Sequence, residues 1–511
     1  MSKKIHSLLV LFALSGVILF NGCSVDNDGE VIIIPQPAVI KPNLPFIGLT
    51  ASNQLVALNA NAPGTVIGTV TITGLPPGEK ITDIDFRPAT GQLYGLGIMY
   101  GRIYIINPVT GVATVVGTSS FSPALTSPLA GMDFNPTVDR IRIVNASGQN
   151  LRVNPETGVT VGVDAGLNPA GVTPAGAAYT NSFSGASATT LYTIDFLNRN
   201  LYKQDPPNSG LSTIVGGFQL ASGGNVGGFD ISPDNTVSLA TYNYGGAAGL
   251  MRVDLTTGLT VDLGALSTPL IGLAIPTVPV AYSVEVSTNN LLILNLQTPV
   301  IPIFKPITGL QPGESVLGID FRPATNQLYA LGSTSRLYKI DLGTGVATAA
   351  GGVFGTLLSG TNFGFDFNPT VDRVRVVSNT GQNLRLDPNT GAIAAVDVAL
   401  NPGAPAVSAA AYTNNFVGAV TTTLYVIDPL AGNLYIQNPP NNGTLTLVGS
   451  LGVGLSVDNG FDIGGVSGKA FGFFNTGSTN KIYNINLTTG AATEFTTVAA
   501  TTRGFTVGLG M

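Results

Sequence analysis

The sequence has few of the side chains on which enzymes most often rely. Its 511 residues include one cysteine, Cys23, one histidine, His6, and no tryptophan. His6 lies in an N-terminal segment that we expect to be removed during export. The remaining chain would then lack histidine and a free thiol, which excludes Ser-His-Asp and Cys-His catalysis, disulfide bonds, and metal centres with histidine or thiolate ligands. We predict no cofactor and no bound metal.

Charged residues are also scarce, at 10% of the chain against about 25% in an average soluble protein. There are 22 Lys and Arg residues and 28 Asp and Glu residues, so the net charge is −6. Loss of residues 1–22 removes Lys3 and Lys4 and brings the net charge to −8. No basic tract, P-loop or dinucleotide-binding glycine motif is present in the sequence. We therefore expect binding of neither nucleic acid nor nucleotides.

The N-terminus has the pattern of a signal peptide. Lys3 and Lys4 precede an apolar segment at residues 8–20, which is interrupted only by Ser15 and Gly16. This segment is too short to span a bilayer as a helix. We predict that residues 1–22 are a signal peptide.

The residues that follow the apolar segment resemble the lipobox of bacterial lipoproteins. Phe20, Asn21 and Gly22 precede Cys23, although leucine is usual where Phe20 stands. The resemblance implies that Cys23 is acylated and becomes the new N-terminus, so the membrane would be bound through this lipid. Ser24 after the cysteine, rather than aspartate, favours the outer membrane or the cell surface. The alternative is an ordinary signal peptide with an unmodified cysteine.

Residues 23–45 are rich in Asp and Asn and then in proline, which predicts an extended linker between the lipid and the first domain.

The rest of the chain is a tandem duplication. Residues 131–144 return almost unchanged as residues 364–377, and eight consecutive residues from Asp133 are identical to those from Asp366. The period is 233 residues. This repeat and the length of the chain predict two domains, at residues 46–277 and 278–511.

A recurrent turn divides each copy into smaller units of short alternating strands. Each turn has Asn or Asp first and Gly last, and successive glycines lie 46 to 52 residues apart. The acidic or amide side chain caps the turn, and glycine accepts the left-handed conformation. The turns lie at residues 107–111, 154–158, 205–210, 254–258, 341–345, 387–391, 438–443 and 486–490. Four strands in about 40–50 residues are typical of a β-propeller blade.

The two ends of each copy complete one another. Each copy opens with three strands and ends with a single strand, at residues 270–275 in the first copy and 504–509 in the second. If this last strand joins the first blade, it covers both open edges. We predict an all-β protein with two tandem propellers of five four-stranded blades each, joined at residues 276–279. Six blades per copy or a right-handed β-solenoid are the alternatives.

Carboxylates are the remaining candidates for chemistry. Aspartates recur on the expected inner strands, where they could face the central channel as ligands or as a catalytic pair. The alternative, which we favour, is that they hold the corners between strands. The six candidates are Asp85, Asp133, Asp230, Asp320, Asp366 and Asp462.

Arginines form a second candidate group. They share one face of adjacent strands and could together bind an anion. The alternative, which we favour, is ion pairing between blades with Asp139, Asp133 and their counterparts. The six arginines are Arg140, Arg142, Arg152, Arg373, Arg375 and Arg385.

The duplicated blocks resemble a known bacterial family. The segments are Ile-Asp-Phe-Arg-Pro-Ala-Thr followed by Gln-Leu-Tyr, and Asp-Phe-Asn-Pro-Thr-Val-Asp-Arg. They are similar to domain of unknown function 4394, in two copies from about residue 46 to the end. The resemblance implies a propeller-like fold and no established activity, so no catalytic residue is transferred.

Three hypotheses for function follow. The one we favour is a lipid-anchored envelope or surface protein that binds or scaffolds a protein or glycan without catalysis. An alternative is a carboxylate-based glycoside hydrolase or lyase acting on an envelope or extracellular glycan. A third is that the two domains serve only as a spacer or cover at the surface.

Overall fold

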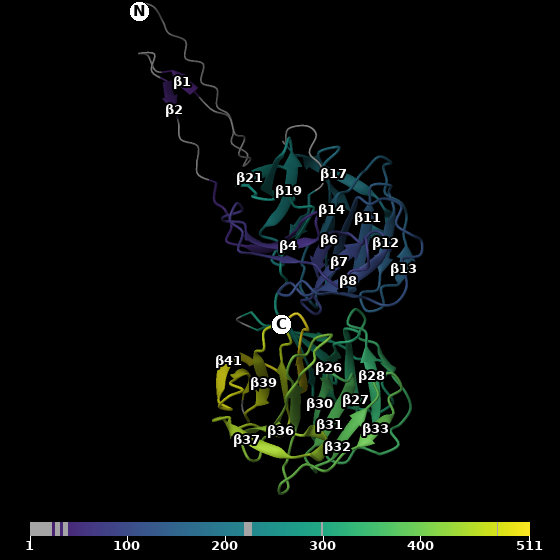
Figure 1. The fold of residues 1–511 in the computed structure, drawn as a ribbon, viewed down its shortest axis with the longest axis vertical. Coiled ribbons are helices and arrows are strands. Elements are labelled where there is room, and N and C mark those ends of the chain that lie inside the picture. The colour runs from purple at the N-terminus through teal and green to yellow at the C-terminus, as the bar shows by residue number, and fades with distance from the viewer. Residues whose placement is uncertain (1–22, 26–30, 34–38, 219–226, 298–299, 478) are drawn as a thin grey trace, which may run out of the picture.

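Two β-propellers lie one above the other in the computed structural model (Figure 1). It describes residues 23–25, 31–33, 39–218, 227–297, 300–477 and 479–511. The predicted signal peptide, residues 1–22, lies outside these ranges. The predicted all-β fold with two five-bladed propellers is confirmed, because ten four-stranded antiparallel sheets form two rings of five. The six-bladed and solenoid alternatives were wrong.

The first propeller comprises the sheets β22-β3-β4-β5, β6 to β9, β10 to β13, β14 to β17 and β18 to β21. Its strands are β3 (Pro45–Leu49), β4 (Gln54–Asn59), β5 (Gly68–Thr71), β6 (Ile81–Phe86), β7 (Leu93–Gly97), β8 (Arg102–Ile106), β9 (Ala113–Val115), β10 (Ala130–Asn135), β11 (Arg140–Asn145), β12 (Asn150–Val153), β13 (Thr160–Val163), β14 (Gly176–Tyr179), β15 (Leu191–Asp195), β16 (Asn200–Gln204), β17 (Ser212–Gly217), β18 (Phe229–Ile231), β19 (Ser238–Tyr244), β20 (Ala247–Val253), β21 (Thr260–Ala265) and β22 (Gly272–Ala274).

The second propeller repeats this arrangement with the sheets β42-β23-β24-β25, β26 to β29, β30 to β33, β34 to β37 and β38 to β41. Its strands are β23 (Val280–Glu285), β24 (Leu291–Asn295), β25 (Pro302–Lys305), β26 (Val316–Arg322), β27 (Gln327–Gly332), β28 (Arg336–Ile340), β29 (Ala347–Ala349), β30 (Phe363–Asn368), β31 (Arg373–Ser378), β32 (Asn383–Leu386), β33 (Ile393–Val396), β34 (Ala409–Tyr412), β35 (Leu424–Asp428), β36 (Asn433–Gln437), β37 (Leu445–Ser450), β38 (Asn459–Ile463), β39 (Ala470–Asn475), β40 (Asn480–Ile485), β41 (Ala492–Val498) and β42 (Thr502–Val507).

Each ring is closed by the last strand of its own copy. β22 pairs with β3 in the register Ala274 to Ile47, and β42 pairs with β23 in the register Val507 to Ala281. Both closing strands are the innermost strands of their blades, and they pack against the inner strands β6 and β26 of the following blades. The first blade of each propeller therefore joins the two ends of the copy, as its unpaired terminal strands predicted.

The recurrent turns form as the sequence predicted. Asn107 Oδ1 accepts the backbone N–H groups of Val109 at 2.9 Å and Thr110 at 3.0 Å. Gly111 then adopts a φ of 74°, in the left-handed region that glycine enters without steric cost. In the turns of the fourth blades, two short 3-10 helices occur, η1 (Pro207–Ser209) and η2 (Pro440–Asn442).

The predicted linker is not extended along its whole length. Two short strands, β1 (Cys23–Val25) and β2 (Val31–Ile33), pair as an antiparallel ribbon. Figure 1 shows this ribbon apart from both propellers. The sequence analysis expected an extended linker here and did not predict this pairing. Val31, Ile32 and Ile33 are β-branched residues with a high strand propensity.

The inner strands approach one another closely, so the axis of each ring is narrow. A Cβ atom at Gly131 on β10 would lie 2.5 Å from the backbone nitrogen of Ala177 on β14. In the second propeller, a space among the inner strands has a volume of about 10 Å³, close to the minimum for one water molecule. The axes are thus packed with backbone and side chains.

The propellers pack through corresponding faces, the ones that carry the turn after each inner strand. Tyr282 donates a hydrogen bond to the backbone oxygen of Ala89 at 2.8 Å, and the N–H of Gly510 donates to Thr90 O at 2.8 Å. Ala89 packs in the same buried apolar cluster as Phe321 and other residues of the second propeller. These contacts bury the turn at residues 87–92 of the first propeller beneath the second.

Candidate functional site

Three carboxylates meet on the axis of each propeller. In the first, Asp85, Asp133 and Asp230 project from the inner strands β6, β10 and β18. One oxygen of each lies within 4.8 Å of the others, and the three residues are 2–3% exposed. Asp320, Asp366 and Asp462 form the corresponding group in the second propeller, with the same separation limit and at most 1% exposure. The structure therefore brings the six predicted aspartates together as two buried triads.

These carboxylates connect neighbouring blades. Asp85 accepts the N–H of Phe134 on the next inner strand at 2.9 Å, and Asp230 accepts the N–H of Ile275, after the closing strand, at 2.6 Å. In the second propeller, Asp462 accepts the N–H of Val507 at 2.7 Å. Each such bond satisfies a backbone donor that lies between two sheets, where no strand partner is available.

Burial and mutual repulsion control the protonation of the triads. Burial raises the pKa of Asp230 and of Asp462 to about 7. Burial also raises the pKa of Asp85 well above its usual value, and the charge of Asp230 raises it further. For Asp366, burial and then the charge of Asp320 act in the same direction. Closely spaced buried carboxylates cannot all ionise at low cost, so each triad retains protons or requires another positive charge.

Arg142 and Arg152 do not form an open anion site. Arg142 is 1% exposed, and its Nη1 lies 2.6 Å from Asp164 Oδ2. Its Nη2 donates to Asn208 Oδ1 at 2.5 Å, which links the third blade to the fourth. Arg152 donates to the two oxygens of Asp164 at 2.8 and 2.9 Å. Although burial raises the pKa of Asp164, hydrogen bonds from the two arginines lower it overall.

The second propeller repeats this arrangement. Arg375 lies 2.6 Å from Asp397 and donates to Asn441 of the following blade at 2.7 Å. Arg385 makes two hydrogen bonds to the same Asp397, at 2.7 and 2.9 Å. These four arginines pair with Asp164 and Asp397, whereas the sequence analysis expected Asp133, Asp139 and their counterparts as their partners. Asp133 cannot serve because its carboxylate lies at the axis.

The remaining arginine of each group lies apart from these pairs. Arg140 donates to Asp341 of the second propeller at 2.9 Å, and Arg373 lies 3.3 Å from Asp387 of its own propeller. No cluster of three guanidinium groups around a shared space is present among the residues that the structure describes.

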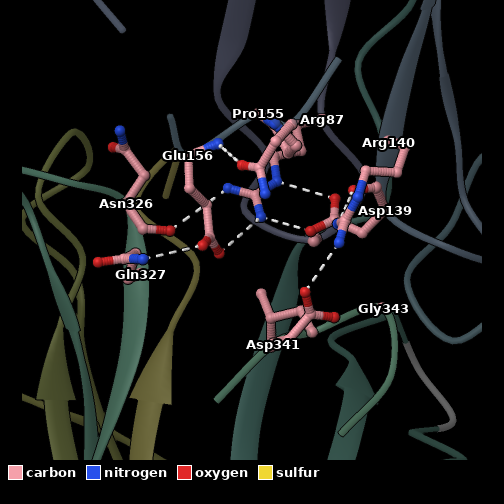
Figure 2. Close-up of polar contacts among 12 residues, drawn as sticks. Arg87, Asp139, Arg140, Pro155, Glu156, Asn326, Gln327, Asp341 and Gly343 are labelled. Atoms are coloured by element: carbon pink, nitrogen blue, oxygen red, sulfur yellow. Dashed lines mark hydrogen bonds and ion pairs between the residues drawn. The ribbon is translucent and has the colours of Figure 1, made fainter. Parts of the chain in front are cut away.

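A buried arginine, which the sequence analysis did not single out, lies between the propellers (Figure 2). Arg87 is 0% exposed, and its Nε donates to Asp139 Oδ1 at 2.9 Å. Its Nη1 donates to the backbone oxygen of Asn326 in the second propeller at 3.3 Å, and its Nη2 lies 3.4 Å from Glu156 Oε1. Glu156 in turn accepts a hydrogen bond from Gln327 at 3.1 Å.

The corresponding residues of the second propeller make no such contact with the first. Arg322, the counterpart of Arg87, donates to Asp372 Oδ1 at 2.8 Å and to Asn389 Oδ1 at 2.8 Å. Asn389 stands where the first copy has Glu156. This difference between the two copies could have drawn attention to Glu156 in the sequence. Likewise, the recurrence of Asp164 as Asp397 could have indicated the partners of the arginines.

An open hollow on the second propeller lies elsewhere. It has a volume of about 400 Å³ and is lined by Glu285, Val286, Ser287, Asn480 and residues 499–501. These residues follow β23 and precede β42, so the hollow is on the face of the second propeller opposite to the first. It contains none of the twelve predicted aspartates and arginines.

Comparison with known proteins agrees with the duplication. The family described as domain of unknown function (DUF4394) matches residues 54–274 and 290–506. The chain belongs to this family. Each DUF4394 copy corresponds to one propeller, and among curated proteins none matches the chain.

Solved structures with low sequence identity are also similar. The extracellular domain of a proposed one-component system from B. thetaiotaomicron is 12% identical, with 89% of this chain and 70% of that chain covered and a TM-score of 0.25. A protein from Lactobacillus plantarum is 16% identical, with coverage of 63% and 95% and a TM-score of 0.28. A proposed 6-phosphogluconolactonase from Bacteroides fragilis is 12% identical, with coverage of 63% and 94% and a TM-score of 0.27. These TM-scores are too low to support an argument about function.

Within the described residues, none of the helices has the length and apolar character needed to cross a bilayer.

Proposed function

We propose that this protein is a lipid-anchored component of the bacterial envelope that acts as a non-catalytic binding scaffold. The main observation in support of this proposal is the interface between the propellers. Arg87, Asp139 and Glu156 of the first propeller form a buried polar network with Asn326 and Gln327 of the second. A buried polar interface holds two binding surfaces at a fixed distance and orientation. A flexible linker would not fix either of them.

The outer edges of the blades supply surfaces for a partner. Val161 and Val163 on β13 are 49% and 63% exposed, and Val396 on β33 is 61% exposed. Both strands are the outermost of their sheets. An outermost strand with free backbone groups and apolar side chains is a surface to which another chain adds as a strand.

The axial carboxylates support this proposal over glycoside hydrolysis. A glycosidase places two carboxyl groups about 5–10 Å apart on either side of an accessible bond. Here the oxygens lie within 4.8 Å of one another, and Asp85 and Asp320 are 3% and 1% exposed. A sugar ring has no access to the triads.

An activity screen tests the non-catalytic role. The full chain, purified in detergent, is incubated with a panel of envelope glycans, lactones and esters beside its Asp85→Asn and Asp320→Asn variants. We expect no turnover by any of the three proteins. Turnover by the wild type that either substitution abolishes would refute the proposal.

Binding and anchoring need separate measurements. Glycan arrays and crosslinking in intact cells distinguish a binding scaffold, which gives a reproducible partner, from a spacer, which gives none. For the anchor, cells are labelled with radioactive palmitate. We expect label in the wild type and in Ser24→Ala, and none in Cys23→Ala; equal labelling of all three would contradict lipid attachment at Cys23.

A further inference from the structure

The carboxylate oxygens of the two axial triads have different hydrogen-bond partners. In the second propeller, Thr506 Oγ1 lies 2.9 Å from Asp320 and 2.9 Å from Asp462, so its hydroxyl bridges two of the three carboxylates. In the first propeller the corresponding residue is Ala274. The correspondence follows from the next residues, Ile275 and Val507, whose N–H groups donate to equivalent aspartates. The first triad therefore lacks the bridging hydroxyl.

One carboxylate oxygen of the first triad has no partner. Asp133 is 2% exposed, and its Oδ1 makes no hydrogen bond although it is buried. A buried acceptor without a donor destabilises the fold, and more so when it is charged. The carboxyl group of Asp133 is one of the three whose oxygens converge on the axis. The carboxyl group of Asp133 thus has a buried oxygen without a donor and lies beside the two other carboxyl groups of the triad.

The first propeller also has one more buried carboxyl group beside its triad. Asp83, two residues before Asp85, is 4% exposed and accepts the N–H of Met132 at 2.8 Å. Its counterpart in the second propeller is Gly318. Among the described residues, no ion pair links Asp83, Asp85, Asp133 or Asp230 to a lysine or arginine. Four buried carboxyl groups therefore lack a cationic side chain.

We propose that Asp85, Asp133 and Asp230 bind a calcium ion on the axis of the first propeller, with Asp83 adding negative charge nearby. All ligand atoms are oxygens, which hard cations prefer. Calcium–oxygen distances of about 2.3–2.6 Å accommodate carboxylate oxygens that lie within 4.8 Å of one another. Magnesium keeps several of its own waters, for which a triad of residues only 2–3% exposed leaves little room.

The backbone orients the proposed ligands. Asp85 accepts Phe86 N–H at 2.7 Å and Phe134 N–H at 2.9 Å, one on each oxygen. Asp230 accepts Ile231 N–H and Ile275 N–H, both at 2.6 Å. A carboxylate oxygen with one hydrogen bond keeps a further lone pair for a cation. Because the triad joins three different blades, calcium would tie the ring together, and its binding would be coupled to folding.

Calcium content tests this proposal, with the second propeller as an internal control. The full chain is refolded in detergent with calcium chloride, washed in metal-free buffer and measured by mass spectrometry of the metal. We expect one calcium per wild-type chain, none in Asp133→Asn and one in Asp366→Asn. A wild type without calcium, or two calcium ions of which Asp366→Asn loses one, would overturn the assignment.

A second variant keeps the result interpretable if Asp133→Asn does not fold. Ala274→Thr introduces the hydroxyl that the second propeller has, at a position that is 0% exposed. We expect it to keep the wild-type circular dichroism and to bind calcium at least tenfold more weakly in titration calorimetry. Unchanged calcium affinity in folded Ala274→Thr would contradict a site at this position. Excess magnesium is expected to leave the calcium content unchanged.

Discussion

Arg87 and Asp139 form a buried ion pair between the second and third blades of the first propeller, at the surface that contacts the second. The Nε of Arg87 lies 2.9 Å from Asp139 Oδ1, and a second hydrogen bond from Nη2 to Oδ2 makes the pair bidentate. The same guanidinium donates to Asn326 across the interface. A single side chain therefore joins two blades to each other and one propeller to the other.

Replacement of Arg87 is expected to uncouple the propellers. Arg87→Ala leaves Asp139 and Glu156 buried without their cation, and removal of one partner of a buried ion pair costs about 3–5 kcal/mol. We predict two separate transitions in scanning calorimetry, the earlier one from the first propeller. Arg322→Ala is the matched control, because Arg322 contacts Asp372 and Asn389 of its own propeller. It should destabilise only the second; identical thermograms for both variants would contradict this role.

Because the inner strands lie close together, we predict that their glycines cannot be replaced by a larger residue without a loss of stability. In Gly131→Ala the new methyl group would lie 2.5 Å from the nitrogen of Ala177, so the third and fourth blades must separate. Overpacking of this kind costs about 1–3 kcal/mol or more. Urea denaturation monitored by circular dichroism measures the loss. Gly352→Ala, with no atom within 4 Å of its new Cβ, should change stability little, and an equal loss in both variants would show that the axis is not tightly packed.

The protonated triad of the second propeller predicts a pH-dependent stability. Burial raises the pKa of Asp462 from 3.8 to about 7, so between these values the folded protein holds a proton that the unfolded chain has released. Unfolding releases this proton, and the free energy of unfolding falls as the pH rises through this range, by about 1.4 kcal/mol per pH unit for each proton. Below pH 3.8 the contribution is complete.

Urea denaturation with EDTA across this pH range measures the slope. We expect Asp462→Asn to reduce the slope, because its amide does not titrate. Asp205→Asn, whose side chain is 58% exposed in the native protein, should keep it. A slope that is unchanged in Asp462→Asn would mean that this carboxyl group does not hold a proton in the folded state.

The sequence was sufficient to predict the fold because its determinants are local and repeated. The turn that ends in Gly111 occurs in eight of the ten blades, and the spacing of these turns gave the size of the blade. Each copy begins with three strands and ends with a single one, which predicted that the last strand completes the first blade. The ribbon of β1 and β2 was not predicted, since three-residue strands leave little pattern in a segment rich in Asp, Asn and Pro.

The site was predicted only in part, because contacts between blades depend on distances that the sequence does not contain. The position of Asp85 before its turn placed it correctly on an inner strand. The partner of Arg142 was missed because Asp164 lies 22 residues away, in the connection between two blades. Glu156 meets Gln327 only because the propellers pack through corresponding faces. No local pattern indicates that packing.

The separate closure of the two rings is tested most directly by engineered disulfide bonds. The background is Cys23→Ser, which contains no cysteine. Val507 pairs with Ala281 across the closing strand, so Ala281→Cys with Val507→Cys should form an intramolecular disulfide, seen by mass spectrometry of non-reduced peptides. The pair Phe46→Cys and Val507→Cys tests the alternative of one ten-bladed ring, in which β42 would pair with β3. This second pair should form no disulfide. A disulfide in the second pair and not in the first would contradict two separately closed propellers.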